Sequence, residues 1–137
     1  MIESVDMFHL AKEISKVSAK KDIITNILLE VNVGKEESKS GIYLEGLNEL
    51  VSEVAEMDNI KIKGLMTIPP ICDSEAEVSK YFESMYQTFI DIKNKKIDNV
   101  DMDILSMGMS HDYEAAVKNG SNIVRVGSAI FGARKYF

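Results

Sequence analysis

Two patterns of apolar and polar residues alternate along this chain, one with the spacing of an α-helix and one made of short apolar runs. The apolar runs predict five strands, at 2–6, 23–33, 60–68, 104–107 and 122–126. Between them, apolar residues recur every three or four positions and predict four helices, at 7–21, 43–54, 74–96 and 111–119. Strict alternation of strands and helices predicts an α/β fold with one parallel sheet.

Several of the predicted elements begin or end at a recognisable signal. The stretch Ser74–Glu77 is a capping box, which predicts the start of the third helix, and Pro69-Pro70 ends the strand before it. Gly120 stands where a glycine ends the fourth helix. Methionines and aromatic residues follow the third helix at helical spacing, so we expect them in the core. Residues 134–137 are expected to form a short surface tail.

The segment 104–132 holds most of the candidate chemistry. Each of its two strands is followed by a turn with glycine, and parallel strands place both turns at the carboxyl edge of the sheet. Barrel enzymes hold phosphate in the loops after their last strands. Ser110 offers a hydroxyl and is expected to cap the following helix. Gly127 allows a close approach of the backbone to a ligand, and Ser128 adds a second hydroxyl, so the segment predicts a phosphate site.

Arg125 lies between two valines of the last predicted strand, so its side chain is expected to point away from them, into a barrel or along its rim. A buried guanidinium is costly unless it has a partner. The residue types alone leave a structural alternative open. In that alternative Ser110 only caps a helix, Gly127 only makes a turn, and Arg125 pairs with an acidic residue such as Asp103 or Asp112.

The stretch Met107–Arg134, MGMSHDYEAAVKNGSNIVRVGSAIFGAR, resembles the closing segment of the pyridoxal-phosphate homeostasis protein family. The barrel of that family is similar to the N-terminal domain of alanine racemase. The stretches Asn26–Ile42 and Lys61–Pro70 resemble the same family, in the same order along the chain. The resemblance therefore covers nearly the whole chain and rests on three separate motifs.

The resemblance implies a role for four residues. In the family, the serine of the M-S-x-D turn and the G-S/T turn hold the phosphate of pyridoxal 5′-phosphate, and these positions match Ser110, Gly127 and Ser128. The arginine two residues before that glycine faces the pyridine nitrogen, and here it is Arg125. An arginine there keeps the ring nitrogen unprotonated and weakens its electron-sink chemistry. The resemblance implies a cofactor carrier or buffer rather than an enzyme with turnover, and no catalytic residue is predicted.

One departure from the family limits this expectation. Family members carry the Schiff-base lysine on the first barrel strand, and the opening Ile2–Asp6 of this chain resembles their fourth strand. We therefore expect one domain over 1–137, a partial (β/α)8 TIM-type barrel that is truncated at its N-terminal side and lacks the Schiff-base lysine. A complete barrel takes about 200 residues or more. The expected binding of pyridoxal phosphate, or of inorganic phosphate, is weak and non-covalent. Alanine racemase activity is disfavoured, because that enzyme's second domain and catalytic bases would be missing.

Composition narrows the class of protein further. A hydrophobic fraction of 45% with 28% charged residues is typical of a soluble globular domain. A net charge of −6 argues against nucleic-acid and anionic-membrane partners. The chain has no long apolar run, and charged residues occupy its start, so we expect a cytoplasmic protein. The single cysteine, Cys72, and the two histidines, His9 and His111, cannot form a closed zinc site, so no metal is expected.

A few further residues have two interpretations. Lys39 lies in a polar loop at the same edge as the phosphate turns, where it could contact a ligand or form an imine, although a solvated loop charge is the preferred interpretation. Met66 could pack against a cofactor ring or fill the core. His111 could approach a phosphate. Cys72 is expected to be an ordinary surface thiol.

Two alternative functions remain at this stage. An open five-stranded sheet exposes two unpaired edges, so the chain could be a truncated barrel fragment that acts only as an interaction module, through self-association or a complementing fragment. An unrelated phosphate-binding barrel enzyme is the other alternative, and the two glycine-containing motifs together disfavour it.

Overall fold

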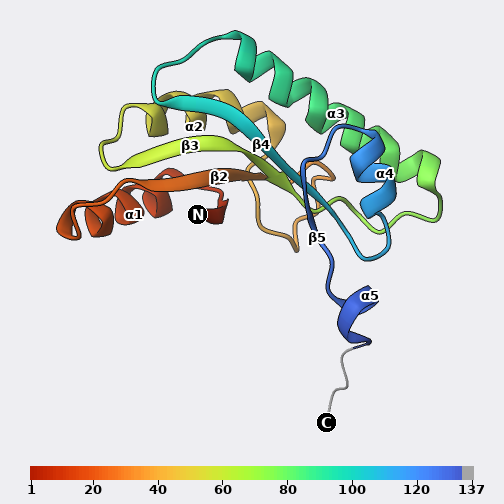
Figure 1. The fold of residues 1–137 in the computed structure, drawn as a ribbon. Helices are drawn as coiled ribbons and strands as arrows, with labels where there is room; N and C mark the ends of the chain where they lie inside the picture. Colours follow the sequence, from red (N-terminus) through yellow and green to blue (C-terminus); the bar gives the residue numbers. More distant parts are fainter. Residues whose placement is uncertain (134–137) are drawn as a thin grey trace.

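The computed structural model describes residues 1–133, and these residues form five strands and five helices in alternation. The elements are β1 (Ile2–Val5), α1 (Phe8–Lys20), β2 (Thr25–Val31), α2 (Leu44–Ala55), β3 (Ile60–Thr67), α3 (Glu75–Asn94), β4 (Val100–Met109), α4 (Tyr113–Lys118), β5 (Ile123–Arg125) and α5 (Ser128–Phe131). Figure 1 shows α2 and α3 covering one side of a curled sheet. The α/β prediction is confirmed.

All neighbouring strands of the sheet are parallel, in the order β1-β2-β3-β4-β5. Sequential parallel strands that curl with their helices outside form part of a (β/α) barrel, as predicted. The carboxyl ends of the strands share one edge of the sheet, so the loops after β2, β3, β4 and β5 meet there. This edge is where the candidate phosphate turns lie.

The apolar core fills the space between the helices and the outer face of the sheet. Phe82 and Met85 of α3 are fully buried and belong to the same core cluster as Ile27 and Leu29 of β2. Each such side chain contributes about 1.5–3 kcal/mol by removing apolar surface from water. The methionine and aromatic stripe of α3 therefore packs in the core, as its spacing predicted.

The structure corrects two of the predicted elements. The strand expected at 104–107 begins earlier, at Val100, and ends at Met109. The first part of β4 carries two aspartates and therefore did not appear as an apolar run. Asp101 and Asp103 are accommodated in the strand because they form ion pairs with lysines of β3 on the inner face. The last turn of the described chain is a fifth helix, the four-residue α5, which the apolar pattern did not predict. The predicted tail at 134–137 lies outside the described residues.

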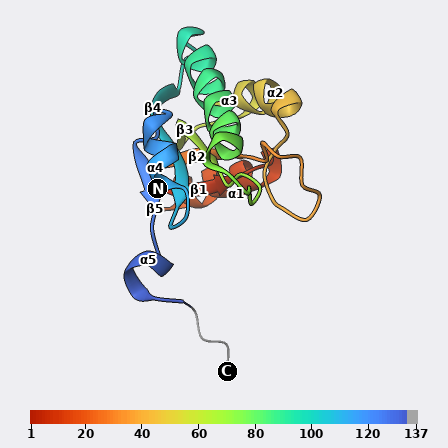
Figure 2. The same ribbon diagram turned by 90° about the vertical axis from the view of Figure 1, so that its right-hand side faces the viewer.

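The short helix α5 projects beyond the end of β5, away from the rest of the sheet (Figures 1 and 2). Its apolar side chains Ile130 and Phe131 are 68% and 87% exposed. At the opposite edge of the sheet, Met1, Met7 and Phe8 beside β1 are exposed as well. Exposed apolar groups thus accompany both edges of the half-barrel.

Candidate cofactor site

The turn after β4 and the turn after β5 meet through the side chain of Ser110. Its Oγ accepts hydrogen bonds from the backbone N–H groups of Gly127, at 3.1 Å, and Ala129, at 3.2 Å. Ser128 lies between these two amides, at the start of α5. The structure therefore brings Ser110, Gly127 and Ser128 together at one edge of the sheet, as their positions in a βαβ unit predicted.

Ser110 does not cap the helix that follows it, contrary to the prediction. The helix α4 begins at Tyr113, and the residue at its N-cap position is Asp112. The Asp112 carboxylate instead accepts a hydrogen bond of 2.6 Å from the backbone N–H of Met109 and closes the turn. Because β4 continues to Met109, the helix starts three residues after Ser110, and the serine hydroxyl is left to face the neighbouring turn.

Among residues 1–133, no packing contact requires a glycine at position 127. Its backbone φ of −117° lies outside the left-handed region, and a Cβ built there would meet no atom of these residues within 4 Å. A side chain at this position would occupy the space beside the Ser110 hydroxyl and the amides of the turn. The open space at Gly127 therefore fits a ligand that approaches the backbone closely, which is how phosphate binds to glycine turns.

Arg125 points to the inner face of the sheet and is held by neutral groups. Its Nη1 donates to the Oγ of Ser106 at 2.6 Å, and its Nη2 donates to the backbone carbonyl of Thr67 at 2.9 Å. Among residues 1–133 it forms no ion pair, because Asp103 pairs with Lys63 and Asp112 closes its own turn. The alternative in which Arg125 pairs with Asp103 or Asp112 is therefore wrong.

Burial and surrounding carboxylates act on Arg125 in opposite directions. Desolvation lowers the pKa of its guanidinium, whereas the charges of Glu3, Asp112 and Glu30 raise it. An arginine keeps its charge under such conditions. Arg125 is thus a permanent cation at the carboxyl edge, with hydrogen-bond donors and no acceptor.

Glu30 of β2 is a second charged group that faces the inner side of the sheet, only 9% exposed. Burial raises the pKa of its carboxyl group, the charge of Asp6 raises it further, and Arg125 lowers it. The apolar pattern did not indicate a role for Glu30 or Ser106, because both lie within apolar runs. A charged residue inside an apolar strand would have been the signal for Glu30.

The loop after β2 is more ordered than its polar sequence suggests. The side-chain amide of Asn32, which is buried, donates to the carbonyls of Glu36 at 2.8 Å and Lys39 at 3.2 Å. Lys39 forms an ion pair of 2.5 Å with Glu36 and donates to the carbonyl of Pro69 at 3.2 Å. Lys39 therefore ties two loops of the carboxyl edge together, which differs from the freely solvated charge that we expected.

The remaining candidates have modest roles in the structure. Met66 is 6% exposed and lies outside the core cluster of the outer face. Burial and the charges of nearby carboxylates raise the pKa of the Cys72 thiol, so this thiol is not activated. The side chain of His111 is exposed.

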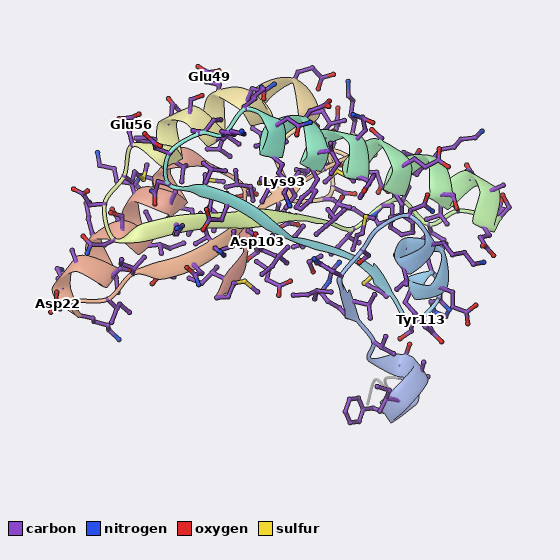
Figure 3. The ribbon with its side chains drawn as sticks, turned by 45° about the horizontal axis from the view of Figure 1, so that its top comes forward. Asp22, Glu49, Glu56, Lys93, Asp103 and Tyr113 are labelled. Atoms are coloured by element: carbon purple, nitrogen blue, oxygen red, sulfur yellow. The ribbon has the colours of Figure 1, made fainter. Side chains whose placement is uncertain are left out.

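A cavity of about 770 Å³ opens between the loops after β3 and β4. Its lining includes Pro69, Pro70, Met109, Ser110 and Tyr113. Met109 is the last residue of β4, so the cavity lies at the carboxyl end of that strand, next to Tyr113 at the start of α4, which Figure 3 labels. Within residues 1–133, no group of three or more acidic, histidine or cysteine side chains is placed to hold a metal ion. No helix in this part of the chain is long and apolar enough to cross a membrane.

A curled sheet of sequential parallel strands, with helices on its outer face, defines the class of (β/α)-barrel proteins. Residues 1–135 match the family model described as alanine racemase, N-terminal domain. The chain belongs to this family.

Similar proteins carry a more specific name. The pyridoxal phosphate homeostasis protein of Aquifex aeolicus is 43% identical over 136 residues, and the match covers 99% of this chain and 59% of that protein. The protein of the same name from Escherichia coli K12 is 38% identical, with 97% of this chain and 56% of that protein covered. The chain thus spans less than two thirds of the length of these relatives. The resemblance inferred from the three motifs is confirmed.

Solved structures support the same relationship. PipY of Synechococcus elongatus PCC7942, solved with pyridoxal phosphate bound, is 25% identical with a TM-score of 0.86, over 95% of this chain and 59% of that one. A protein from Bifidobacterium adolescentis is 38% identical with a TM-score of 0.88, over 94% of this chain and 51% of that one. The alanine racemase of Clostridium difficile 630, at 16% identity and a TM-score of 0.67, shares the fold. The prediction of a partial barrel is confirmed.

Proposed function

We propose that this chain binds pyridoxal 5′-phosphate non-covalently, in the role of a cofactor carrier or buffer. The observation that carries the proposal is the junction of Ser110 with the amides of Gly127 and Ala129, at the same edge as Arg125. Relatives named for pyridoxal phosphate homeostasis, and PipY with the cofactor bound, support the choice of ligand. The chain spans 59% of the length of the first of these relatives. The role of carrier or buffer, which belongs to the whole protein, is therefore proposed here together with the binding.

The residues present fit the two ends of this cofactor. Backbone amides and hydroxyl groups at Ser110, Gly127 and Ser128 suit a phosphate, since they donate hydrogen bonds without adding a charge that must be desolvated. Arg125 suits a ring nitrogen that accepts a hydrogen bond, because a guanidinium donates and cannot take up a proton. The bound cofactor supplies an electrophilic aldehyde and an electron sink, and a permanently charged arginine weakens the sink.

The proposal does not include catalytic turnover. A carrier needs reversible binding, whereas racemisation requires acid and base groups on both faces of the cofactor. Alanine racemase activity is tested by incubating the protein with L-alanine and pyridoxal phosphate and measuring D-alanine. Formation of D-alanine at a rate above that of free pyridoxal phosphate would contradict the carrier role.

The binding proposal is tested by titrating the purified protein with pyridoxal 5′-phosphate and following its absorbance before and after borohydride. We expect saturable binding that Arg125→Ala weakens and that borohydride does not trap. Covalent trapping would show that a lysine forms an imine, and Lys39→Ala would then identify the first candidate. No saturable binding to a folded protein would contradict the proposal.

We also propose that polypeptide covers the two edges of the half-barrel, either a second copy of the chain or a complementing segment. The strand order places β1 and β5 at the edges of the described sheet, and exposed apolar side chains lie beside both. The relatives favour cofactor binding over a role as an interaction module alone. Light scattering after size-exclusion chromatography gives the mass, and a folded monomer at high concentration would argue against self-association.

A further inference from the structure

Ser106 of β4 joins three strands that are distant in sequence. Its Oγ accepts a hydrogen bond of 2.6 Å from Nη1 of Arg125, on β5, and lies 2.8 Å from Oε2 of Glu3, on β1. An arginine can only donate and a carboxylate can only accept. The direction of the chain of hydrogen bonds is therefore fixed, from Arg125 to Ser106 to Glu3.

The serine at the centre of this chain is fully buried, with 0% of its surface exposed. Its one proton and the lone pair that faces Arg125 are both engaged within the protein. A buried hydroxyl that loses a hydrogen-bond partner is destabilising, so the arrangement resists rotation of the Ser106 side chain. Ser106 therefore gives Arg125 a fixed point of attachment on the inner face.

A second attachment fixes the plane of the guanidinium. The Nη2 atom of Arg125 donates to the carbonyl of Thr67 at 2.9 Å. Thr67 is itself fully buried, and its hydroxyl donates to the carbonyl of Val31 at 2.6 Å. Two anchored nitrogens define the orientation of a planar group. Within residues 1–133, the other donors of this guanidinium have no hydrogen-bond partner and are free for a ligand at the carboxyl edge.

We propose that Ser106 and Glu3 are positioning residues that hold Arg125 ready for an aromatic ring nitrogen and so determine which ring the site accepts. The inference rests on the proposed function, since it names what makes the same site selective. An arginine side chain has many rotamers and loses conformational entropy when it is ordered. The hydrogen bonds to Ser106 and to the carbonyl of Thr67 order the Arg125 side chain before the ligand binds, so this loss of entropy does not weaken binding.

The fixed cation also discriminates between forms of the ring. A ring nitrogen with a free lone pair accepts from Arg125, whereas a ring nitrogen that carries a methyl group or a proton is cationic and is repelled. The serine–glycine turn takes no part in this choice, because it contacts the phosphate at the other end of the cofactor. Loss of Ser106 or Glu3 should therefore change ring selectivity and leave phosphate affinity intact.

The test compares three ligands on the full chain and its variants: pyridoxal 5′-phosphate, the same cofactor methylated at its ring nitrogen, and inorganic phosphate. Ser106→Ala is expected to weaken the binding of pyridoxal phosphate about tenfold and to leave the affinity for inorganic phosphate unchanged. The difference in affinity between pyridoxal phosphate and its N-methylated form should become smaller. Glu3→Gln removes the charge and keeps the shape, and we expect a smaller change of the same kind. Ser84→Ala, an exposed serine of α3, is the matched control.

A second measurement does not depend on any ligand. In the wild-type protein, the side-chain N–H signals of Arg125 in a ¹⁵N NMR spectrum should be sharp, because rotation of the anchored guanidinium is slow, and Ser106→Ala should broaden them. Unchanged signals in a folded Ser106→Ala variant, or equal losses for cofactor and inorganic phosphate, would overturn the positioning role. Failure of the wild-type protein to bind pyridoxal phosphate while these signals stay sharp would overturn the proposed function and the ring selectivity built on it.

Discussion

The hydroxyl oxygen of Ser110 lies 3.1 Å from the backbone nitrogen of Gly127, 17 residues later in the chain. The hydroxyl accepts from this amide and from that of Ala129. A phosphate oxygen is also an acceptor, so the two amides can donate to a phosphate once the Ser110 side chain rotates its oxygen away from them. The two amides already converge on one acceptor position, so the change that the proposed binding requires is the rotation of one side chain.

Gly127→Ala should separate binding from stability. No atom of the part of the chain that the structure describes lies within 4 Å of the position of the new Cβ, and the φ of −117° is not in the left-handed region that favours glycine. We expect the free energy of unfolding to change by less than about 1 kcal/mol. Binding of pyridoxal phosphate should weaken about tenfold or more, because the methyl group occupies the approach to the amides. Isothermal titration and urea unfolding measure the two effects, and an unchanged affinity would show that phosphate does not approach Gly127.

Gly64→Ala should have the opposite profile. Gly64 has a φ of +151°, and a Cβ there would lie 1.7 Å from the carbonyl oxygen of Ile104 on β4. An alanine must push β3 and β4 apart at the point of their closest approach, so we expect a loss of about 3 kcal/mol or more. Urea unfolding followed by circular dichroism gives the value. A loss below about 1 kcal/mol would mean that the two strands separate easily at this point.

Glu30→Gln should change how stability depends on pH. Burial raises the pKa of Glu30 above its ordinary value of 4.5, so the folded chain binds this proton more tightly than the unfolded chain. The contribution of Glu30 to stability is therefore fully present below about pH 4.5 and is lost as the pH rises through the raised pKa. Glutamine has no such proton, so the variant should gain stability relative to the wild-type protein as the pH rises through this window.

Urea unfolding at a series of pH values tests this expectation, and Glu13→Gln provides a control of opposite sign. A hydrogen bond from Lys16 lowers the pKa of Glu13, so its contribution is present above the ordinary value and is lost as the pH falls through its folded pKa. Parallel pH profiles for Glu30→Gln and the wild-type protein would contradict the raised pKa of the Glu30 carboxyl group.

Lys63→Met should remove the centre of the charged cluster on the inner face. The Nζ of Lys63 lies 2.5 Å from Asp103 and 3.1 Å from Asp101. Both hydrogen bonds raise the pKa of Lys63, and the hydrogen bond to Asp103 has the larger effect. Water reaches the cluster, so we expect a loss of only about 0.5–1 kcal/mol at low salt and less at high salt. Lys80→Met, on the exposed side of α3, is the control. A loss that salt does not reduce would indicate that packing of the lysine stem matters more than its charge.

The sequence by itself determined the order of strands and helices and the edge at which the site lies. Apolar spacing is a local property, and the need to bury each apolar face leaves few arrangements for alternating strands and helices. The N-cap at Ser74 is confirmed by the hydrogen bond from the N–H of Glu77 to the serine hydroxyl, whereas the Glu77 carboxylate accepts from the N–H of Asp73 and not from that of Ser74. The motifs around Ser110 and Gly127 placed both turns at the carboxyl edge for the same reason.

Only the tertiary structure decided what the side chains at that edge contact. Ser106 and Glu3 are 103 residues apart, and no local pattern indicates that Glu3 accepts from the serine that holds Arg125. The hydrogen-bond partners of the Ser110 hydroxyl depend on where β4 ends. The end of β4 could not be predicted from apolar spacing, because the strand mixes polar and apolar residues. Hydrogen bonds are short and directional, so they depend on atomic positions that apolar periodicity does not specify. The sequence therefore indicated where the candidate site lies, and the way the strands curl determined its hydrogen bonds.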